Sequence, residues 1–249
     1  MSIYGEGAYR CAACGEVYPE LRPADQLSRH EWHMPCPRCG KPVDAVPTPE
    51  SKPCFSTSVY AISKKVQEEM CLCVGRAYGI PTVALRYFNA VGPRQALSNP
   101  YTGVAAIFSS RLLNNHRPLV YEDGLQSRDF ISVKDIARAN LMAMESDRAN
   151  FQSINLGTGR PTSVVDVARM LASALGKPIE PEVLNAFRQG DIRHCYADIG
   201  KARALLGFEP SVKIEEWIPR LVEWVRIQQP KDRVERARKE LEKRGLTLA

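Results

Sequence analysis

The sequence lacks the features of a membrane, secreted or repeat protein. No run approaches the roughly 18 consecutive apolar residues that read as a membrane span, and the first residues do not show the charged-then-apolar order of a secretory signal. Internal repeats and low-complexity segments are also missing. We therefore expect a cytoplasmic protein that does not associate with membranes.

A strong excess of one charge is absent as well. The 249 residues include 34 basic and 28 acidic side chains, and the resulting net charge of +6 is spread along the chain. Such a mild excess fits an anionic small substrate at least as well as a nucleic acid. With 44% hydrophobic residues, the chain is able to bury a full core as one large or two smaller domains.

The sequence contains no glycine-rich phosphate turn of the G-x-G-x-x-G type. Gly157 and Gly159 follow a predicted strand, but no third glycine comes at the required spacing, and the next helix is predicted to begin at a serine cap. These two glycines therefore do not predict a dinucleotide site.

Cysteine is plentiful, and its spacing favours a metal over disulfides. Cytoplasmic thiols are kept reduced. Cys11 and Cys14 form one pair, Cys36 and Cys39 form another, and a glycine follows each pair. This spacing suits four thiolates around one tetrahedral zinc, against the alternative of four unrelated buried thiols. Four sulfur ligands complete the shell, so the zinc would be structural and would not activate water.

The other candidate metal ligands have no such pattern. His30 and His33 lie between the two pairs and are predicted to be surface residues, because the cysteines already fill the shell. The remaining cysteines are predicted to be small packing residues: Cys54, Cys71, Cys73 and Cys195.

Hydrophobic periodicity predicts an α/β fold. Helices are expected at 59–78, 104–113, from 133 onward and at 164–175, and strands at 82–88, 119–122, 129–131 and 153–156. Residues 1–7 are expected to be the end of a strand and its turn, and residues 231–244 a solvated terminal helix. The alternation of helices and strands indicates βαβ units with a parallel sheet.

Tyr60 and Lys64 form the candidate catalytic pair. A spacing of four residues at the start of a predicted helix places both side chains on one face. The charge of a nearby ammonium favours the phenolate, which brings a tyrosine within reach of acid–base chemistry near neutral pH. The pair alone is equally typical of an amphipathic surface, so it needs support from neighbouring motifs.

Several motifs provide this support. They are Ser-Ile-Tyr-Gly-Glu at 2–6, Ser-Val-Tyr-Ala-Ile-Ser-Lys at 58–64 and Leu-Arg-Tyr-Phe-Asn-Ala-Val-Gly-Pro-Arg-Gln at 85–95. In this order they resemble the extended short-chain dehydrogenase/reductases, in particular the NAD-dependent epimerase/dehydratase family. Further motifs at 128–131, 155–159 and 190–193 continue the same order. The cysteine-bearing insertion and residues 94–101 look most like the dTDP-L-rhamnose 4-epimerases.

This resemblance implies the C-terminal part of a Rossmann-type, doubly wound parallel sheet with a small α/β substrate domain and an inserted zinc ribbon. Residues 1–10 and 54–97 would form a partial NAD-binding domain, and residues 11–53 the zinc ribbon. Residues 98–228 would form a substrate-binding region interleaved with Rossmann elements, and residues 229–249 a C-terminal helix.

The resemblance also implies residue roles. Tyr60 and Lys64 would be catalytic and would contact NAD together with Tyr87. The nucleotide-sugar would be bound by Asn89, Tyr121, Arg128, Arg188, Asp191 and Arg193. Arginine suits such a site because its guanidinium group makes bidentate contacts with phosphate oxygens. The implied reaction is epimerisation of a nucleotide-sugar at C4 by transient oxidation, catalysed by a homodimer in the full-length form.

The family's glycine-rich turn and its catalytic serine or threonine would precede Met1. We therefore expect an N-terminally truncated chain with impaired activity. A nucleotide-sugar dehydratase, an inactive sugar-binding fragment, and a zinc-ribbon module that binds nucleic acid or protein are the alternatives. The mixed charge and scattered aromatics of residues 11–53 argue against nucleic acid.

Overall fold

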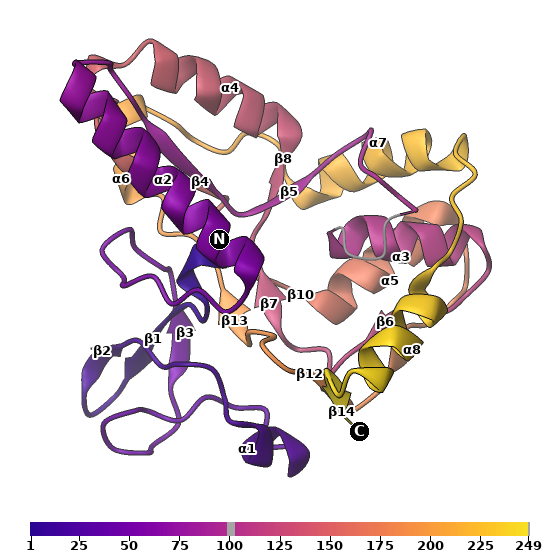
Figure 1. Cartoon of the computed structure of the whole chain (residues 1–249). Helices are drawn as coiled ribbons and strands as arrows, with labels where there is room; N and C mark the ends of the chain where they lie inside the picture. The colour runs from indigo at the N-terminus through magenta and orange to yellow at the C-terminus, as the bar shows by residue number, and fades with distance from the viewer. Residues whose placement is uncertain (99–102, 249) are drawn as a thin grey trace.

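Two parallel strands, β4 (Ala84–Tyr87) and β9 (Ser153–Leu156), lie at the centre of one half of the molecule (Figure 1). The computed structural model describes residues 1–98 and 103–248. Side chains alternate between the two faces of this pair, as in any β-strand. Leu85 and Ile154 pack into a core on one face, whereas Arg86 and Ser153 bind Glu68 on the other.

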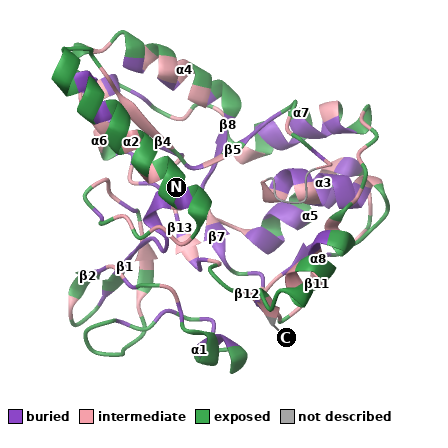
Figure 2. Cartoon of the chain, viewed as in Figure 1, coloured by how far each residue is buried: buried purple, intermediate pink, exposed green. Residues whose placement is uncertain are grey.

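Helices cover both faces of this strand pair. The helix on the polar face is α2 (Val59–Tyr78), whose bounds agree with the predicted 59–78. It begins at an N-cap, Ser58, and ends at Gly79 in the left-handed conformation. The other face is covered by α4 (Val133–Met144) and α6 (Gly200–Leu206). Most of α2 is exposed (Figure 2).

The other half of the molecule is built around three helices. These are α3 (Val104–Leu113), α5 (Val164–Leu175) and α7 (Ile214–Arg226). Their apolar faces form the largest core of the described residues, and Phe130 and Val120 pack into it from neighbouring strands. The predicted bounds of α3 and α5 are confirmed, because a repeated apolar stripe and, for α5, the caps Ser163 and Gly176 fix a helix locally.

Short strands connect the two halves. The parallel pairs are β5 (Asn89–Val91) with β8 (Phe130–Ser132), and β6 (Leu119–Val120) with β11 (Glu182–Val183). A three-stranded sheet has the order β10 (Thr162–Ser163), β7 (Ser127–Arg128), β13 (His194–Cys195). At the C-terminus, β12 (Phe187–Arg188) pairs with β14 (Thr247–Leu248), which follows α8 (Val234–Lys243).

The cysteine-bearing insertion forms its own antiparallel sheet. Its strands, in spatial order, are β2 (Gly15–Val17), β1 (Ala8–Cys11) and β3 (Asp44–Val46), and a short helix α1 (Ala24–Ser28) follows β2 in the chain. The glycine after each cysteine pair has a positive φ, 75° at Gly15 and 71° at Gly40. Glycine adopts this conformation without a steric penalty, so it allows a tight turn after each cysteine pair.

Some local predictions are wrong. Residues 2–4 form a short 3₁₀ helix, η1 (Ser2–Tyr4), where the end of a strand was expected. Cys71 and Cys73 are exposed on α2 and are not packing residues, although Cys195 is buried. A second 3₁₀ helix, η2 (Asp147–Ala149), was not predicted. The part of the 94–101 motif from residue 99 onward lies outside the described residues.

No helix within residues 1–98 and 103–248 combines the length and apolar character needed to cross a membrane.

Candidate functional site

A cavity of about 450 Å³ lies between the first residues of the chain, α3, α8 and the loops around β7 and β12. Its walls bring together residues that are distant in the sequence. Five of the six residues predicted to bind a nucleotide-sugar line it: Asn89, Tyr121, Arg128, Arg188 and Asp191. The residues that the family resemblance suggested therefore meet at one place in the fold.

Arg128 is fixed to the cavity wall by backbone carbonyls. Its Nη1 donates hydrogen bonds to the carbonyl oxygens of Ser127 (2.8 Å) and Arg193 (3.0 Å), and its Nη2 donates to that of Ile192 (2.6 Å). A guanidinium group held in this way keeps its positive charge in one position. It also holds the segment that carries Asp191 and Ile192 against β7.

Arg188 lies over the ring of Tyr121, with its Cζ 4.5 Å from the ring centroid. Its Nε donates to Oδ2 of Asp191 at 2.9 Å. The charge of Asp191 is the main cause that raises the pKa of Arg188 above its usual value, against the effect of burial. A cation stacked on an aromatic ring is a preformed arrangement, because both groups already have their mutual orientation before a ligand arrives.

Two amide oxygens in the cavity wall have no hydrogen-bond partner among the described residues. They are Oδ1 of Asn89 and Oε1 of Gln126, and both atoms are buried. The Nε2 of Gln126 donates to the carbonyl oxygen of Tyr121 at 3.0 Å, which orients the side chain. A buried acceptor without a partner is costly, so these oxygens are well suited to accept N–H or O–H donors of a ligand. Sequence reasoning missed Gln126, which belongs to none of the motifs.

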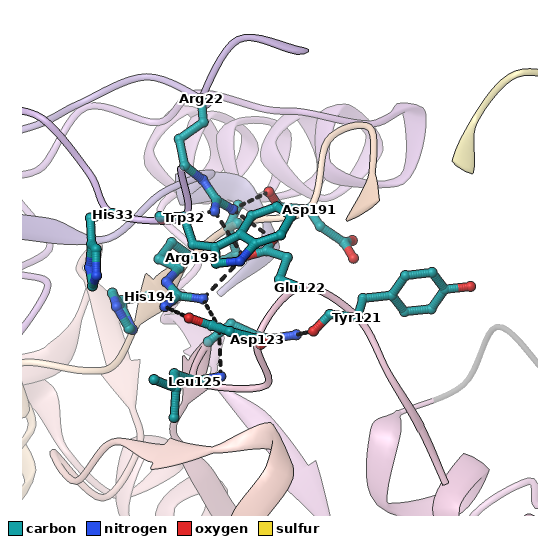
Figure 3. Close-up of polar contacts among 12 residues, drawn as sticks. Arg22, Trp32, His33, Tyr121, Glu122, Asp123, Leu125, Asp191, Arg193 and His194 are labelled. Atoms are coloured by element: carbon teal, nitrogen blue, oxygen red, sulfur yellow. Dashed lines mark hydrogen bonds and ion pairs between the residues drawn. The ribbon is translucent and has the colours of Figure 1, made fainter. Parts of the chain in front are cut away.

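Arg193, the sixth predicted residue, does not line the cavity. Only 1% of its side chain is exposed, and its guanidinium group is paired with two carboxylates (Figure 3). Its Nη1 lies 3.1 Å from Oε2 of Glu122 and 2.6 Å from Oδ1 of Asp123, and its Nη2 donates to Oδ2 of Asp123 at 2.8 Å. The structure therefore differs from the predicted role in direct binding, because these carboxylates hold the guanidinium group in the interior.

The cysteine-bearing insertion reaches the same ion-pair cluster through Arg22. Its two Nη atoms donate to the two carboxylate oxygens of Glu122 at 2.8 and 2.9 Å, and Nη1 also donates to the carbonyl oxygen of Trp32. The Arg22 and Glu122 side chains are 1% and 3% exposed. Nη2 further contacts the carbonyl oxygen of Asp191 at 3.4 Å (Figure 3). The insertion is thus joined to the segment that forms part of the cavity wall.

Tyr60 and Lys64 lie together on the exposed side of α2. The Lys64 Nζ is 5.7 Å from the centroid of the Tyr60 ring and donates to Oε1 of Gln67 at 3.1 Å. Neither side chain lines the cavity, but Thr57 and Ser58, three and two residues before Tyr60, do. The predicted proximity of the phenol and the ammonium is therefore present, next to the cavity wall.

Tyr87, the third residue predicted to contact NAD, ends β4. Its hydroxyl donates to Oδ1 of Asn140 on α4 at 2.9 Å, and its side chain is 39% exposed. It does not line the cavity.

The four paired cysteines converge at one point. Cys11 and Cys14 come from the turn between β1 and β2, and Cys36 and Cys39 from a second turn. Their sulfur atoms all lie within 4.8 Å of one another, and the Cys11 and Cys39 sulfurs are 3.6 Å apart. A tetrahedral zinc with bonds of about 2.3 Å would place its sulfur ligands about 3.8 Å apart. The donor set and its spacing therefore fit zinc. His30 and His33 are exposed, as predicted.

Comparisons with known proteins place these features in a family context. The family model described as "NAD dependent epimerase/dehydratase family" matches residues 39–157. The chain is also similar to the dTDP-L-rhamnose 4-epimerase of Burkholderia thailandensis, with 37% identity over 225 residues. That match covers 90% of this chain and 60% of the relative. The chain thus spans about three-fifths of the length of this relative.

The chain is also similar to solved structures of nucleotide-sugar 4-epimerases. A UDP-glucose 4-epimerase from Thermotoga maritima, determined with UDP-glucose, has a TM-score of 0.67 at 38% identity, over 74% of this chain and 58% of that one. A UDP-glucuronic acid 4-epimerase from Bacillus cereus, in complex with UDP-glucuronic acid and NAD, has a TM-score of 0.66 at 27% identity, over 74% and 57%. These similarities support a Rossmann-like epimerase fold for the chain.

Proposed function

The chain belongs to the NAD-dependent epimerase/dehydratase family, and on this basis we propose that its cavity binds a nucleotide-sugar for epimerisation at C4. The observation that carries the proposal is the meeting of Asn89, Tyr121, Arg128, Arg188 and Asp191 in one cavity. Each was selected from the family resemblance of the sequence alone. Their convergence also suits the chemistry of such a ligand, which combines a base, a diphosphate and sugar hydroxyls.

Each part of a nucleotide-sugar has a matching group in the cavity. The positive charges of Arg128 and Arg188 suit the diphosphate. The unpartnered amide oxygens of Asn89 and Gln126 suit the hydroxyl groups of a sugar or the N–H of a pyrimidine base. In this proposal, the ligand supplies the donors that these oxygens lack.

Tyr60 is proposed to move the proton of the reaction. Its phenolate oxygen would take the proton from the C4 hydroxyl, and the charge of Lys64 would stabilise that phenolate. NAD, when bound, supplies the hydride acceptor, so that the sugar passes through a 4-keto form and receives hydride again on its opposite face. Tyr60 would then return the proton to the C4 oxygen.

The residues of this chain fit one part of NAD. Tyr60 and Lys64 present an exposed phenol and ammonium side by side, and the exposed Tyr87 ends the neighbouring strand β4. We propose that these three hold the nicotinamide ribose end. The sequence of this chain contains no glycine-rich turn for the pyrophosphate.

The favoured substrate is dTDP-L-rhamnose. Support comes from the similarity to the Burkholderia dTDP-L-rhamnose 4-epimerase, which covers 90% of this chain. A match of that extent is too long to leave out the whole of the insertion at 11–53, so it includes at least part of the segment that carries the cysteines. The cysteine-bearing insertion was also the feature that suggested this subfamily.

We further propose that the four cysteines bind one structural zinc ion. The mutual distances of the sulfur atoms support this, as does the closed shell of four thiolates, which leaves no position for water or substrate. The zinc would stabilise the turns that carry the cysteines, and would take no part in the reaction.

A homodimer through α2 is also proposed. A row of apolar side chains at helical spacing is exposed on this helix: Val59, Ile62, Val66, Met70, Val74 and Tyr78. Light scattering after size-exclusion chromatography is expected to give twice the mass of one chain for the wild type, and the mass of one chain for Met70→Asp. Glu69→Gln on the same helix is the control, and a monomeric wild type would contradict the proposal.

Calorimetric titration of the purified chain tests the binding proposal. We expect dTDP and UDP to bind, and Arg188→Gln to weaken binding by tenfold or more, as for loss of a charged hydrogen bond. Arg203→Gln is the matched control, because Arg203 is also paired with a nearby carboxylate, Glu209, but does not line the cavity. Absence of binding by both nucleotides would overturn the proposal.

Two further measurements separate the enzyme from its alternatives. Incubation with NAD and either dTDP-L-rhamnose or UDP-glucose, followed by proton NMR, is expected to show the C4 epimer of the first sugar. Titration with NAD alone reports cofactor binding independently. Nucleotide binding without NAD binding or epimerisation would identify the chain as a sugar-binding fragment.

A further inference from the structure

The C-terminal helix α8 forms one wall of the cavity. Its residues Val234, Ala237, Arg238 and Leu241 line that cavity. They occupy positions i, i+3, i+4 and i+7, which lie on a single face of the helix. The predicted solvated helix is therefore present but not solvated on every side, because this one face lines the cavity.

The start of α8 is anchored to α3. Arg111, whose side chain is 6% exposed, contacts Oδ2 of Asp232 at 3.5 Å and Oε1 of Glu235 at 3.1 Å. Asp232 also contacts Nδ1 of His116 at 2.6 Å. Asn114 donates to the carbonyl oxygen of Pro230 at 3.0 Å. Several polar contacts thus fix the position of the helix beside the cavity.

The segment after α8 is joined to the strand that carries Arg188. β14 pairs with β12 in antiparallel register, with Thr247 opposite Arg188. The N–H of Gln189 also donates to the carbonyl oxygen of Leu246 at 3.1 Å. Both ends of the C-terminal segment are therefore tied to elements of the proposed substrate site.

Arg238 resembles Arg188, and differs from Arg128 and Arg111, in the hydrogen-bond donors that it leaves free. The Nη atoms of Arg128 donate to three carbonyl oxygens and Nη1 of Arg111 contacts two carboxylates, whereas Arg188 contacts Asp191 through Nε alone. Arg238 donates through Nε to Oε1 of Glu242 at 2.8 Å. Among the described residues, no group accepts from its two Nη atoms. These two atoms form a planar pair of donors suited to a phosphate.

We propose that Arg238 binds the diphosphate of the nucleotide-sugar and that α8 is part of the substrate site. This inference rests on the proposed function. Glu242 orients the guanidinium group through Nε, and the free Nη atoms donate to phosphate oxygens. The C-terminal segment then serves both to supply this cation and to hold the strand of Arg188.

The same helix offers a matched control for the test. Arg236 is likewise an arginine followed by a glutamate four residues later, with its Nε 3.9 Å from Oε1 of Glu240. Its side chain is 84% exposed, against 37% for Arg238, and it does not line the cavity. Arg238→Gln and Arg236→Gln therefore remove the same charge from the same helix, at positions that differ in access to the cavity.

The experiment is calorimetric titration of the full chain and its variants with dTDP, UDP and dTMP. Arg238→Gln is expected to weaken the binding of dTDP and UDP by tenfold or more, consistent with the loss of a charged hydrogen bond. The binding of dTMP is expected to weaken less. The affinity of Arg236→Gln for each nucleotide is expected to stay within twofold of the affinity of the wild type. Arg238→Lys, which keeps the charge but loses the planar pair of donors, is expected to be intermediate.

The outcomes separate this inference from the proposed function. If the wild type binds neither dTDP nor UDP, the proposed function itself fails. If the wild type binds and Arg238→Gln behaves like Arg236→Gln, the role of Arg238 is refuted while the proposed function stands. If Arg238→Gln weakens the binding of dTDP and of dTMP equally, the proposal that Arg238 binds the diphosphate is refuted. Thermal unfolding of each variant checks folding, and Arg238→Lys replaces Arg238→Gln if the latter unfolds.

Discussion

The buried pair of Arg22 and Glu122 predicts that the insertion stabilises the half of the molecule built around α3, α5 and α7. Replacement of Arg22 by methionine keeps much of the side-chain volume and removes the charge. Glu122 would then keep one cationic partner, Nη1 of Arg193 at 3.1 Å, and lose its two short bonds to Arg22 (Figure 3). A buried carboxylate would be left partly uncompensated.

The size of the effect follows from the burial of both side chains, which are 1% and 3% exposed. Removal of one member of a buried ion pair costs about 3–5 kcal/mol. Because Glu122 keeps its ion pair with Arg193, we expect a value at the lower end of this range, a loss of about 3 kcal/mol in the free energy of unfolding. Glu122→Gln in the Arg22→Met background removes the uncompensated charge, and is expected to recover part of this loss.

Urea denaturation followed by tryptophan fluorescence measures this change. Trp32 is a suitable reporter, because it is buried against Leu27 and Phe187, where the insertion meets β12. Arg29→Met is the control within the same insertion, since Arg29 is paired with exposed carboxylates. If Arg22→Met and Arg29→Met unfold at the same urea concentration as the wild type, the reasoning is refuted.

Three more predictions follow from the structure. Metal analysis of the purified chain is expected to find one zinc per chain and less in Cys39→Ser; a wild type free of zinc would contradict the metal site. Tyr60→Phe is expected to lower the epimerisation rate by ~10²–10⁴-fold without changing dTDP affinity, and an unchanged rate in NMR assays would exclude Tyr60 as the proton carrier. Burial and the nearby arginines lower the pKa of His194 from 6.5 to about 4, so between these values the unfolded chain binds a proton that the native chain does not. Stability is therefore full above pH 6.5 and falls by at most roughly 3 kcal/mol towards pH 4; denaturation curves of His194→Gln that show the same pH dependence as the wild type would speak against this linkage.

The family and several elements could be predicted from the sequence because their signals are local. The Tyr60 and Lys64 motif, with the ordered motifs around it, indicated the epimerase/dehydratase family, and the comparisons confirm it. The bounds of α2 and α5 could be predicted because apolar periodicity and a terminal glycine, and for α5 also the serine N-cap, act over a few residues. The spacing of the cysteine pairs likewise predicted their convergence.

The partners of charged side chains could not be predicted in this way. Arg193 belongs to the same family motif as Asp191, yet its guanidinium group lies in the interior, paired with Glu122 and Asp123. Glu122 in turn binds Arg22, a residue of the insertion that is distant in the sequence. A motif indicates which residue type stands at a position, but the partner of a charge depends on which segments the fold brings together.

The sequence by itself determined which chemistry the chain carries: a tyrosine and lysine pair on one helix, four thiolates in two pairs, and several residues suited to a nucleotide-sugar. These properties depend on side-chain type and short spacing. Only the tertiary structure decided where the cavity lies, that Gln126 and Arg238 line it, and that the insertion contacts its wall through Arg22. These contacts join segments far apart in the chain, and no local rule of helix or strand formation specifies them.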